Sequence, residues 1–170
     1  YTEKTFDLDY IININFINYK EEDHDIFNGK YKEITELSET IKLGNNFFEY
    51  LCKELEKYVE DKKFMKKNNN KFIHLKHNDR DGHYLLISSR RCKILKEKLK
   101  NVEYIKVHNK QIKLSELTFL DLNNNVKIQC EEMKNMSSNV ADYKLELAQL
   151  TKSKFYEEMN LVKNTYLKNI

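Results

Sequence analysis

Apolar residues recur every seven positions in two separate stretches of the chain. The first stretch has two such stripes, interrupted only at Gly44: Ile34, Ile41, Phe48 and Leu55, then Leu37, Leu51, Tyr58 and Met65. This pattern predicts a helix over residues 30–67 that packs lengthwise on a partner helix. At about 1.5 Å per residue the helix would be roughly 50 Å long. Because Gly44 is a gap in the stripe, we expect any bend to occur there.

A second helix is predicted over residues 125–170. Its main and flanking stripes are Val126, Met133, Val140 and Leu147, then Met136, Tyr143 and Leu150. The pattern then slips in phase and continues with another set: Phe155, Met159, Val162 and Tyr166. Such a slip is typical of a change of supercoil or of partner. Two striped helices about sixty residues apart make a natural antiparallel pair, so the segment between them should lie at one end of the pair.

The intervening residues, 68–124, carry strand and turn signals. Apolar and polar residues alternate over 72–77 and 83–89, and the turn sequence Asn78-Asp79-Arg80-Asp81-Gly82 lies between them. This combination predicts a β-hairpin. Asparagine triplets at 68–70 and 123–125 flank the segment, and we expect them to mark where the helical arms end.

Further elements are expected inside the same segment. A short basic helix is predicted over 90–100, with three apolar residues on one face: Cys92, Leu95 and Leu99. Strands are predicted on both sides of a turn at 108–110: 102–107 and 112–122. The expected fold class is therefore α+β, a long antiparallel helical pair that carries a small antiparallel β-sheet and a short helix at its tip.

Positive charge is concentrated in the middle of the chain. Residues 62–113 contain 16 Lys/Arg and 4 Asp/Glu, a net charge of +12, whereas the remaining 118 residues have a net charge of −9. The overall charge of +3 hides this division. A strong basic block within an otherwise acidic chain indicates that a polyanion is bound at one place.

Composition narrows the class of protein. Pro and Trp are absent and there are only 3 Gly, so long uninterrupted helices are permitted. The three cysteines, Cys52, Cys92 and Cys130, are far apart, which argues against a disulfide framework and favours a reducing, intracellular setting. No signal peptide and no apolar run of membrane-spanning length is present, so no membrane partner is expected.

The beginning of the chain suggests a piece of a larger protein. Because the first residue is Tyr1 and not Met, we expect a fragment or a processed product. Residues 1–29 combine a β-like apolar run over 10–17 with acidic residues at 21–25. They are interpreted as a helix or strand that enters from a neighbouring core domain. The abundance of Lys, Asn and Ile is typical of an AT-rich genome.

In the predicted hairpin, Leu75-Lys76-His77-Asn78 is followed by Gly82-His83-Tyr84 and a β-run that ends at Ile87-Ser88. This sequence resembles the clamp hairpin of MutS mismatch-repair proteins. The stretch 25–29 before the first helix and Leu117-Thr118-Phe119 before the second are similar to the segments that flank the lever helices of that family. In order of elements the resemblance covers about residues 25–160. Within it, residues 88–96 look most like the divergent branch of giant viruses and octocoral mitochondria.

The resemblance implies the lever and clamp region of a larger ATPase, with levers that transmit motion to distant ATPase domains. ATP and Mg would be bound elsewhere in the parent protein, and no cofactor is expected in this chain. A clamp needs a second arm, so the parent would be a homodimer, in a viral factory of the host cytoplasm or in a mitochondrion. His83 departs from the family's Tyr, and the chain lacks both the Phe-x-Glu mismatch-reading motif and the phosphate-binding nucleotide loop.

The expected partner is double-stranded DNA, bound through phosphate neutralisation and counterion release with little dependence on sequence. The candidate DNA-backbone residues are Lys71, Lys76, Asn78, Arg80, Arg90, Arg91, Lys93, Lys96 and Lys98. On the hairpin, Lys76, Asn78 and Arg80 follow from the resemblance, whereas Arg90 and Arg91 rest on charge alone. A solvated charged surface is the competing interpretation.

Other chemistry is less well supported. Four residues are of metal-ligating types: His74, His77, His83 and Cys92. A metal site is not expected, because His74 and His77 should point to opposite faces of one strand. Turn formation explains Asp79 and Asp81. No Ser-His-Asp or Cys-His arrangement is apparent, so no catalytic residue is expected. The 11 Tyr and 9 Phe fall mostly on helix stripes and strand faces, which favours core packing over base stacking.

Two other functions stay open. A coiled-coil protein-interaction scaffold with a basic docking tip would prefer one acidic protein to any DNA. An RNA-binding helical arm would prefer structured RNA to duplex DNA of equal charge.

Overall fold

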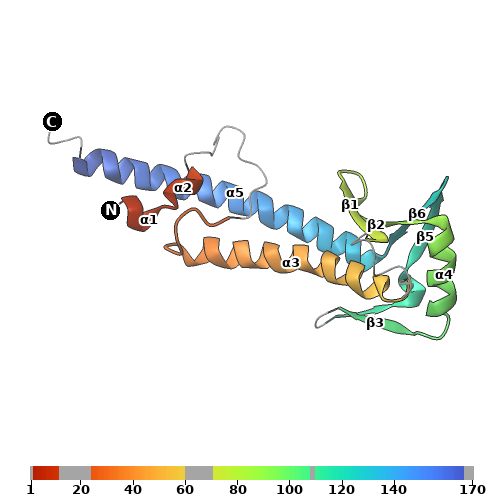
Figure 1. Ribbon diagram of the computed structural model, residues 1–170. Helices are drawn as coiled ribbons and strands as arrows, with labels where there is room; N and C mark the ends of the chain where they lie inside the picture. The colour runs from red at the N-terminus through yellow and green to blue at the C-terminus, as the bar shows by residue number, and fades with distance from the viewer. Residues whose placement is uncertain (1, 12–23, 60–70, 108–109, 167–170) are drawn as a thin grey trace. The chain divides into compact units, whose positions relative to one another are not determined.

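The computed structural model describes residues 2–11, 24–59, 71–107 and 110–166 (Figure 1). Contacts divide the chain into two compact units: unit 1, residues 1–43 with 139–170, and unit 2, residues 44–138. Both boundaries fall inside long helices, at Gly44 within α3 (Lys32–Glu56) and at Asn139 within α5 (Glu131–Tyr166). The fold is mixed α+β, with two antiparallel sheets in unit 2.

Unit 1 contains two short helices, α1 (Thr2–Thr5) and α2 (Leu8–Ile11), together with the first part of α3 and most of α5. Its aromatic core forms where the Phe6 ring contacts Phe27 and Phe155, at centroid distances of 5.5 and 5.8 Å. The buried carboxylate of Glu158 accepts hydrogen bonds from Lys30 and the Tyr31 hydroxyl. Burial and this carboxylate raise the pKa of Tyr31 to about 12.

The approach to α3 is a capped left-handed turn. Asn28 and Gly29 have φ values of 51° and 79°, a region that Gly and Asn tolerate best. Asp25 fixes this turn, since its carboxylate accepts hydrogen bonds from the Phe27 N–H at 2.8 Å and the Thr35 hydroxyl at 2.6 Å. The first helix therefore begins where the sequence predicts it.

The predicted heptad stripe of α3 is buried along its whole length: Ile34, Ile41, Phe48 and Leu55. The helix has 25 residues and is about 37 Å long, shorter than predicted. It ends in a turn in which the Tyr58 and Val59 N–H groups bond to the carbonyls of Leu55 and Glu56. Tyr58 thus lies beyond the helix, and Met65 lies outside the described residues. A bend at Gly44 stays a prediction.

Unit 2 is built on a four-stranded antiparallel sheet with the order β1-β2-β6-β5. Its strands are β1 (Ile73–Asn78), β2 (Gly82–Ser88), β5 (Thr118–Leu122) and β6 (Asn125–Gln129). The predicted β-hairpin is confirmed as β1–β2, in which Asn78 is opposite Gly82. Cross-strand partners share a face, so Leu75, Leu85 and Ile128 point into the same core.

The remaining elements of unit 2 are α4 (Ser89–Leu99), β3 (Tyr104–Val107), β4 (Lys110–Lys113) and the 3₁₀ turn η1 (Leu114–Glu116). The predicted short basic helix is confirmed as α4, with Cys92, Leu95 and Leu99 buried as expected. Strands β3 and β4 form a separate two-stranded sheet. The predicted second strand, 112–122, is not one strand. Its residues form the end of β4, then η1 and then β5.

The prediction of a helix from residue 125 is wrong for its first residues. Asn125–Gln129 form β6, which pairs with β2 on one side and β5 on the other. This central position satisfies the backbone groups of β6 on both edges, and the α5 helix begins only at Glu131. The heptad stripe wrongly predicted helix at Val126. This residue is buried as a strand residue, and it lies seven positions before the buried Met133, a spacing that also fits a helix.

Two related predictions are also corrected. Leu117-Thr118-Phe119 does not lead directly into the second helix, because Thr118 and Phe119 are in β5 and pair with β6. The triplet 123–125 does not mark the end of an arm, because Asn123 and Asn124 make the β5–β6 turn, with Asn123 at a left-handed φ of 48°. The triplet 68–70 lies outside the described residues.

The stripes of α5 are buried to different degrees. Met133, Val140 and Leu147 are buried, and the flanking stripe is half-buried: Met136, Tyr143 and Leu150. After the predicted slip, Met159 is exposed. None of the helices in the described ranges has both the length and the apolar composition needed to span a bilayer.

We expect all three cysteines to be protected from thiol reagents in the folded protein. Cys52, Cys92 and Cys130 are buried, and burial raises the pKa of each thiol, that of Cys52 to about 11. Labelling by a chromogenic disulfide at pH 8 should be at least about 100-fold slower than in denaturant, because only the exposed thiolate reacts. Equal rates for any one cysteine in native and denaturing buffer would contradict the burial of that residue.

Candidate nucleic-acid interface

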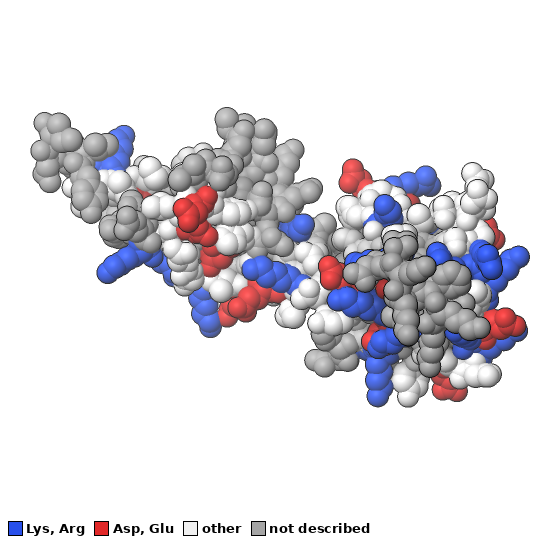
Figure 2. Space-filling view, viewed as in Figure 1, with Lys and Arg blue, Asp and Glu red and all other residues white. Residues whose placement is uncertain are grey.

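The candidate cations on α4 are held at the surface by the way this helix packs. It starts directly after β2, from an extended Ser88, and buries Cys92, Leu95 and Leu99. A helix turns about 100° per residue, so the remaining positions face away from the core. Four cations are exposed there: Arg90, Lys93, Lys96 and Lys98. Figure 2 shows Lys and Arg atoms gathered over α4.

Two cations of α4 are positioned by aromatic rings. The Arg91 guanidinium lies 4.0 Å from the centroid of the Phe72 ring, and the Lys96 ammonium lies 4.6 Å from that of Phe119. Phe72 directly precedes β1 and Phe119 is in β5, the two outer strands of the sheet. Cation–π attraction therefore fixes one cation on each flank of α4. Lys71, the neighbour of Phe72 in the sequence, is exposed.

We call this set the α4 cluster: Lys71, Arg90, Arg91, Lys93, Lys96 and Lys98. The other candidates form the hairpin cluster: Lys76, Asn78 and Arg80. Strand β2 has seven residues, about 23 Å, and separates the hairpin turn from the start of α4. The single basic tip expected from the sequence is therefore divided into two surfaces at opposite ends of β2.

The candidate cations share one electrostatic feature. In the described part of the chain, none of the eight cationic candidates has an acidic side chain within ion-pair distance, whereas five other lysines of unit 2 are paired: Lys53, Lys57, Lys110, Lys127 and Lys134. The acidic partners of these five lysines are Glu49, Glu54, Glu132, Asp81 and Glu131. The uncompensated charge of the candidates makes an external anion a favourable partner.

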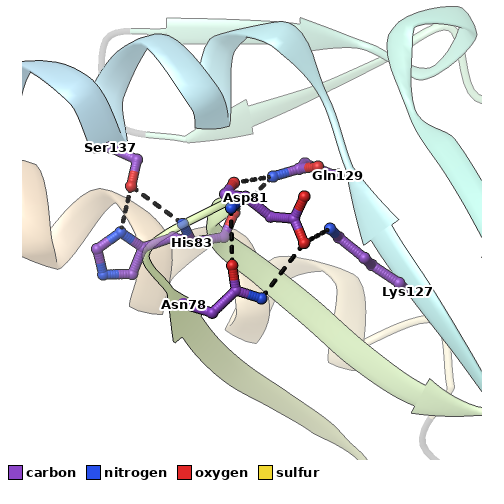
Figure 3. A network of polar contacts seen from close by, with 6 residues as sticks. All are labelled: Asn78, Asp81, His83, Lys127, Gln129 and Ser137. Carbon is purple, nitrogen blue, oxygen red and sulfur yellow. Dashed lines mark hydrogen bonds and ion pairs between the residues drawn. The ribbon is translucent and has the colours of Figure 1, made fainter.

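Asn78, a candidate from the hairpin, has a structural role (Figure 3). Its side-chain oxygen accepts a hydrogen bond from the Asp81 N–H at 2.7 Å. The Asp81 carboxylate pairs with Lys127 at 2.9 Å, and the Gln129 amide donates to the carbonyls of Asp81 and His83 at 2.6 and 3.1 Å. The turn residues Asp79 and Arg80 remain exposed beside this network.

The first strand residues after the turn are fixed by the start of α5. Both the N–H and the ring Nδ1 of His83 lie within hydrogen-bond distance of the Ser137 hydroxyl, at 3.0 and 2.8 Å. The His83 ring also stacks on Phe48 at a centroid distance of 4.0 Å. This packing accounts for a ring at position 83. Sequence reasoning missed Lys127, Gln129 and Ser137, although polar residues alternating with Val126 and Ile128 were a strand signal.

Of the four residues of metal-ligating types, only His77 and His83 come together, with ring centroids 4.6 Å apart. His74 is opposite Leu86 and His77 opposite His83, so the two lie on different faces of β1, as predicted. Within the described ranges, no group of three or more His, Cys, Asp or Glu side chains has a metal-binding arrangement.

No protein-family model and no curated protein matches the chain. The MutS resemblance therefore stays a prediction, and any functional proposal rests on the residues and geometry of the two units.

Gly82→Ala should destabilise the hairpin strongly. Gly82 has a φ of +66°, and an added Cβ would lie 2.5 Å from the Ser137 hydroxyl oxygen. The combined conformational and steric cost is about 2–4 kcal/mol, to be measured as lost hydrogen-exchange protection of β2. Gly29→Ala is the matched control, because Gly29 has a φ of +79° with nothing within 4 Å of an added Cβ. It should lower local protection by only about 1–2 kcal/mol, and equal losses would contradict the close approach of Ser137.

The turn should also weaken in acid. The hydrogen bond from Lys127, and next that from Asn78, lowers the pKa of Asp81 below 3.8. Because the folded pKa is depressed, the stabilisation is complete above about pH 4 and is lost as the pH falls through the folded pKa. The amide shift of Asp81, followed by NMR, should titrate below 3.8 and move upward in Lys127→Met. Asp79→Asn should leave the midpoint unchanged, and no response to Lys127→Met would refute the assignment.

Proposed function

We propose that this chain is the lever and clamp region of a MutS-like mismatch-repair ATPase and that it grips duplex DNA through the phosphate backbone. The observation that carries the proposal is the uncompensated charge of the α4 cluster. Each phosphate neutralised by Lys or Arg releases counterions, so such a surface binds DNA with steep salt dependence and little sequence preference.

The aromatic contacts of α4 support a duplex over a single strand. Proteins that hold single strands present open aromatic faces to the bases. Here Arg91 and Lys96 lie over the rings of Phe72 and Phe119, so these rings are already in contact with cations. The same contacts limit the conformational freedom of the two cations, which reduces the entropy lost on binding a phosphate.

In this proposal α3 and α5 are the two levers and form a long antiparallel pair. Support comes from their buried heptad residues and from the order of elements: a long helix, a hairpin, a short helix, further strands and a second long helix. The chain itself would be non-catalytic. The parent would be an intracellular homodimer that binds ATP and Mg in other domains, in a viral factory or in a mitochondrion.

Duplex binding should depend on the exposed cations of α4. Fluorescence anisotropy with a labelled 30-bp duplex over a salt series should show tighter binding at low salt and no preference for a mismatch. Arg90→Gln/Lys93→Gln should reduce the slope of log Kobs against log salt by about 2, since each lost phosphate contact removes about 0.9.

The matched control is Lys53→Gln/Lys134→Gln, which removes the same charge from lysines already paired with Glu49 and Glu131. It should leave the slope nearly unchanged. Equal slopes in the two variants would mean that the net charge of the chain, and not the position of the α4 cations, determines DNA binding. No duplex binding even at low salt would sink the proposal and favour a protein-docking scaffold, and tighter binding to structured RNA would favour an RNA-binding arm.

A further inference from the structure

The β3–β4 hairpin has one buried and one exposed face. Ile105 is opposite Ile112 and Val107 is opposite Lys110, and three of these four residues are buried. The alternate pairs, Tyr104 with Lys113 and Lys106 with Gln111, must point the other way. We call these four residues the outer face. All of them are exposed, and the Tyr104 side chain has a relative exposure of 45%.

The lysines of this hairpin differ by face. On the buried side, Lys110 pairs with Glu132 and lies over the Phe47 ring. On the outer face, neither Lys106 nor Lys113 forms an ion pair with an acid of the described ranges. The outer face itself has no acidic residue, because the nearest acids in sequence, Glu103 and Glu116, lie outside both strands.

The β3–β4 hairpin follows α4 directly along the chain. The helix carries Lys96 and Lys98 in its last turn, and the Val102 N–H bonds back to the Leu99 carbonyl, so the chain passes directly from α4 into β3. Figure 1 shows the β3–β4 hairpin at the carboxyl end of α4, and Figure 2 shows Lys and Arg atoms over both elements. Both belong to unit 2.

We infer that the outer face of β3–β4 is a second phosphate-backbone contact for duplex DNA, next to the α4 cluster. Diagonal neighbours on a two-stranded ribbon lie about 7–8 Å apart, so Lys106 and Lys113 would reach different phosphates. The Tyr104 hydroxyl and Gln111 amide are donors of the kind that bond to phosphate oxygens. The inference rests on the proposed DNA-binding function and extends it to residues that lie on a separate element.

The test compares four variants of the full chain on the same 30-bp duplex across the same salt series. Lys106→Gln/Lys113→Gln removes the hairpin contact, Arg90→Gln/Lys93→Gln removes part of the α4 contact, and Lys53→Gln/Lys134→Gln is the control. The hairpin variant should reduce the salt slope by about 1.8, and the variant that combines the hairpin and α4 changes by about 3.6. Circular dichroism checks that each variant is folded.

The outcomes distinguish failure of the β3–β4 contact from failure of the proposed DNA binding. If the α4 variant loses slope while the hairpin variant matches the control, the outer face is a solvated surface and the inference is overturned, with the proposed function intact. If the wild-type chain binds no duplex at any salt concentration, the proposal and the inference fail together. A reduced slope in both variants and an additive loss in the combined variant support two separate contacts.

Discussion

The architecture of unit 2 depends on the buried polar side chains of its central strand. Lys127 and Gln129 are both buried in β6, and an unpaired charge or amide there would cost several kcal/mol. Their partners are the carboxylate and carbonyl of Asp81, at 2.9 and 2.6 Å. Satisfying these groups fixes the β1–β2 turn against β6. The register of the β1–β2 hairpin and the pairing of β6 with β2 therefore depend on the same contacts.

This arrangement determines which surfaces carry charge. With the sheet in register, Leu85, Ile87 and Ile128 form a buried apolar face, and the buried residues of α4 share its core. The polar positions of α4 are then directed outward. Residues 44–138 contain 20 Lys/Arg and 13 Asp/Glu. Because several of these acids pair with lysines elsewhere in the unit, the excess of positive charge appears on α4 and on the outer face of β3–β4.

Local sequence patterns were sufficient to predict the elements that depend on neighbouring residues alone. A turn sequence between alternating runs predicted the hairpin, and three apolar residues on one helical face predicted α4. A spacing of seven was not sufficient to distinguish strand from helix at Val126. The spacing shows only that Val126 and Met133 are both buried, and a buried residue of β6 can lie seven positions before a buried residue of α5. The contacts of Gln129 with Asp81 and of Ser137 with His83 join residues about fifty positions apart, and no local pattern encodes them.

The same limit applies to the candidate interface. Composition treats the three lysines of β3–β4 alike, yet the cross-strand register puts Lys110 beside Glu132 and leaves Lys106 and Lys113 on the other face. A shift of one residue would exchange these roles, since neighbouring strand residues point to opposite sides. A count of charges can therefore predict that a polyanion binds. Only the pairing of strands determines which lysines remain uncompensated and available to bind it.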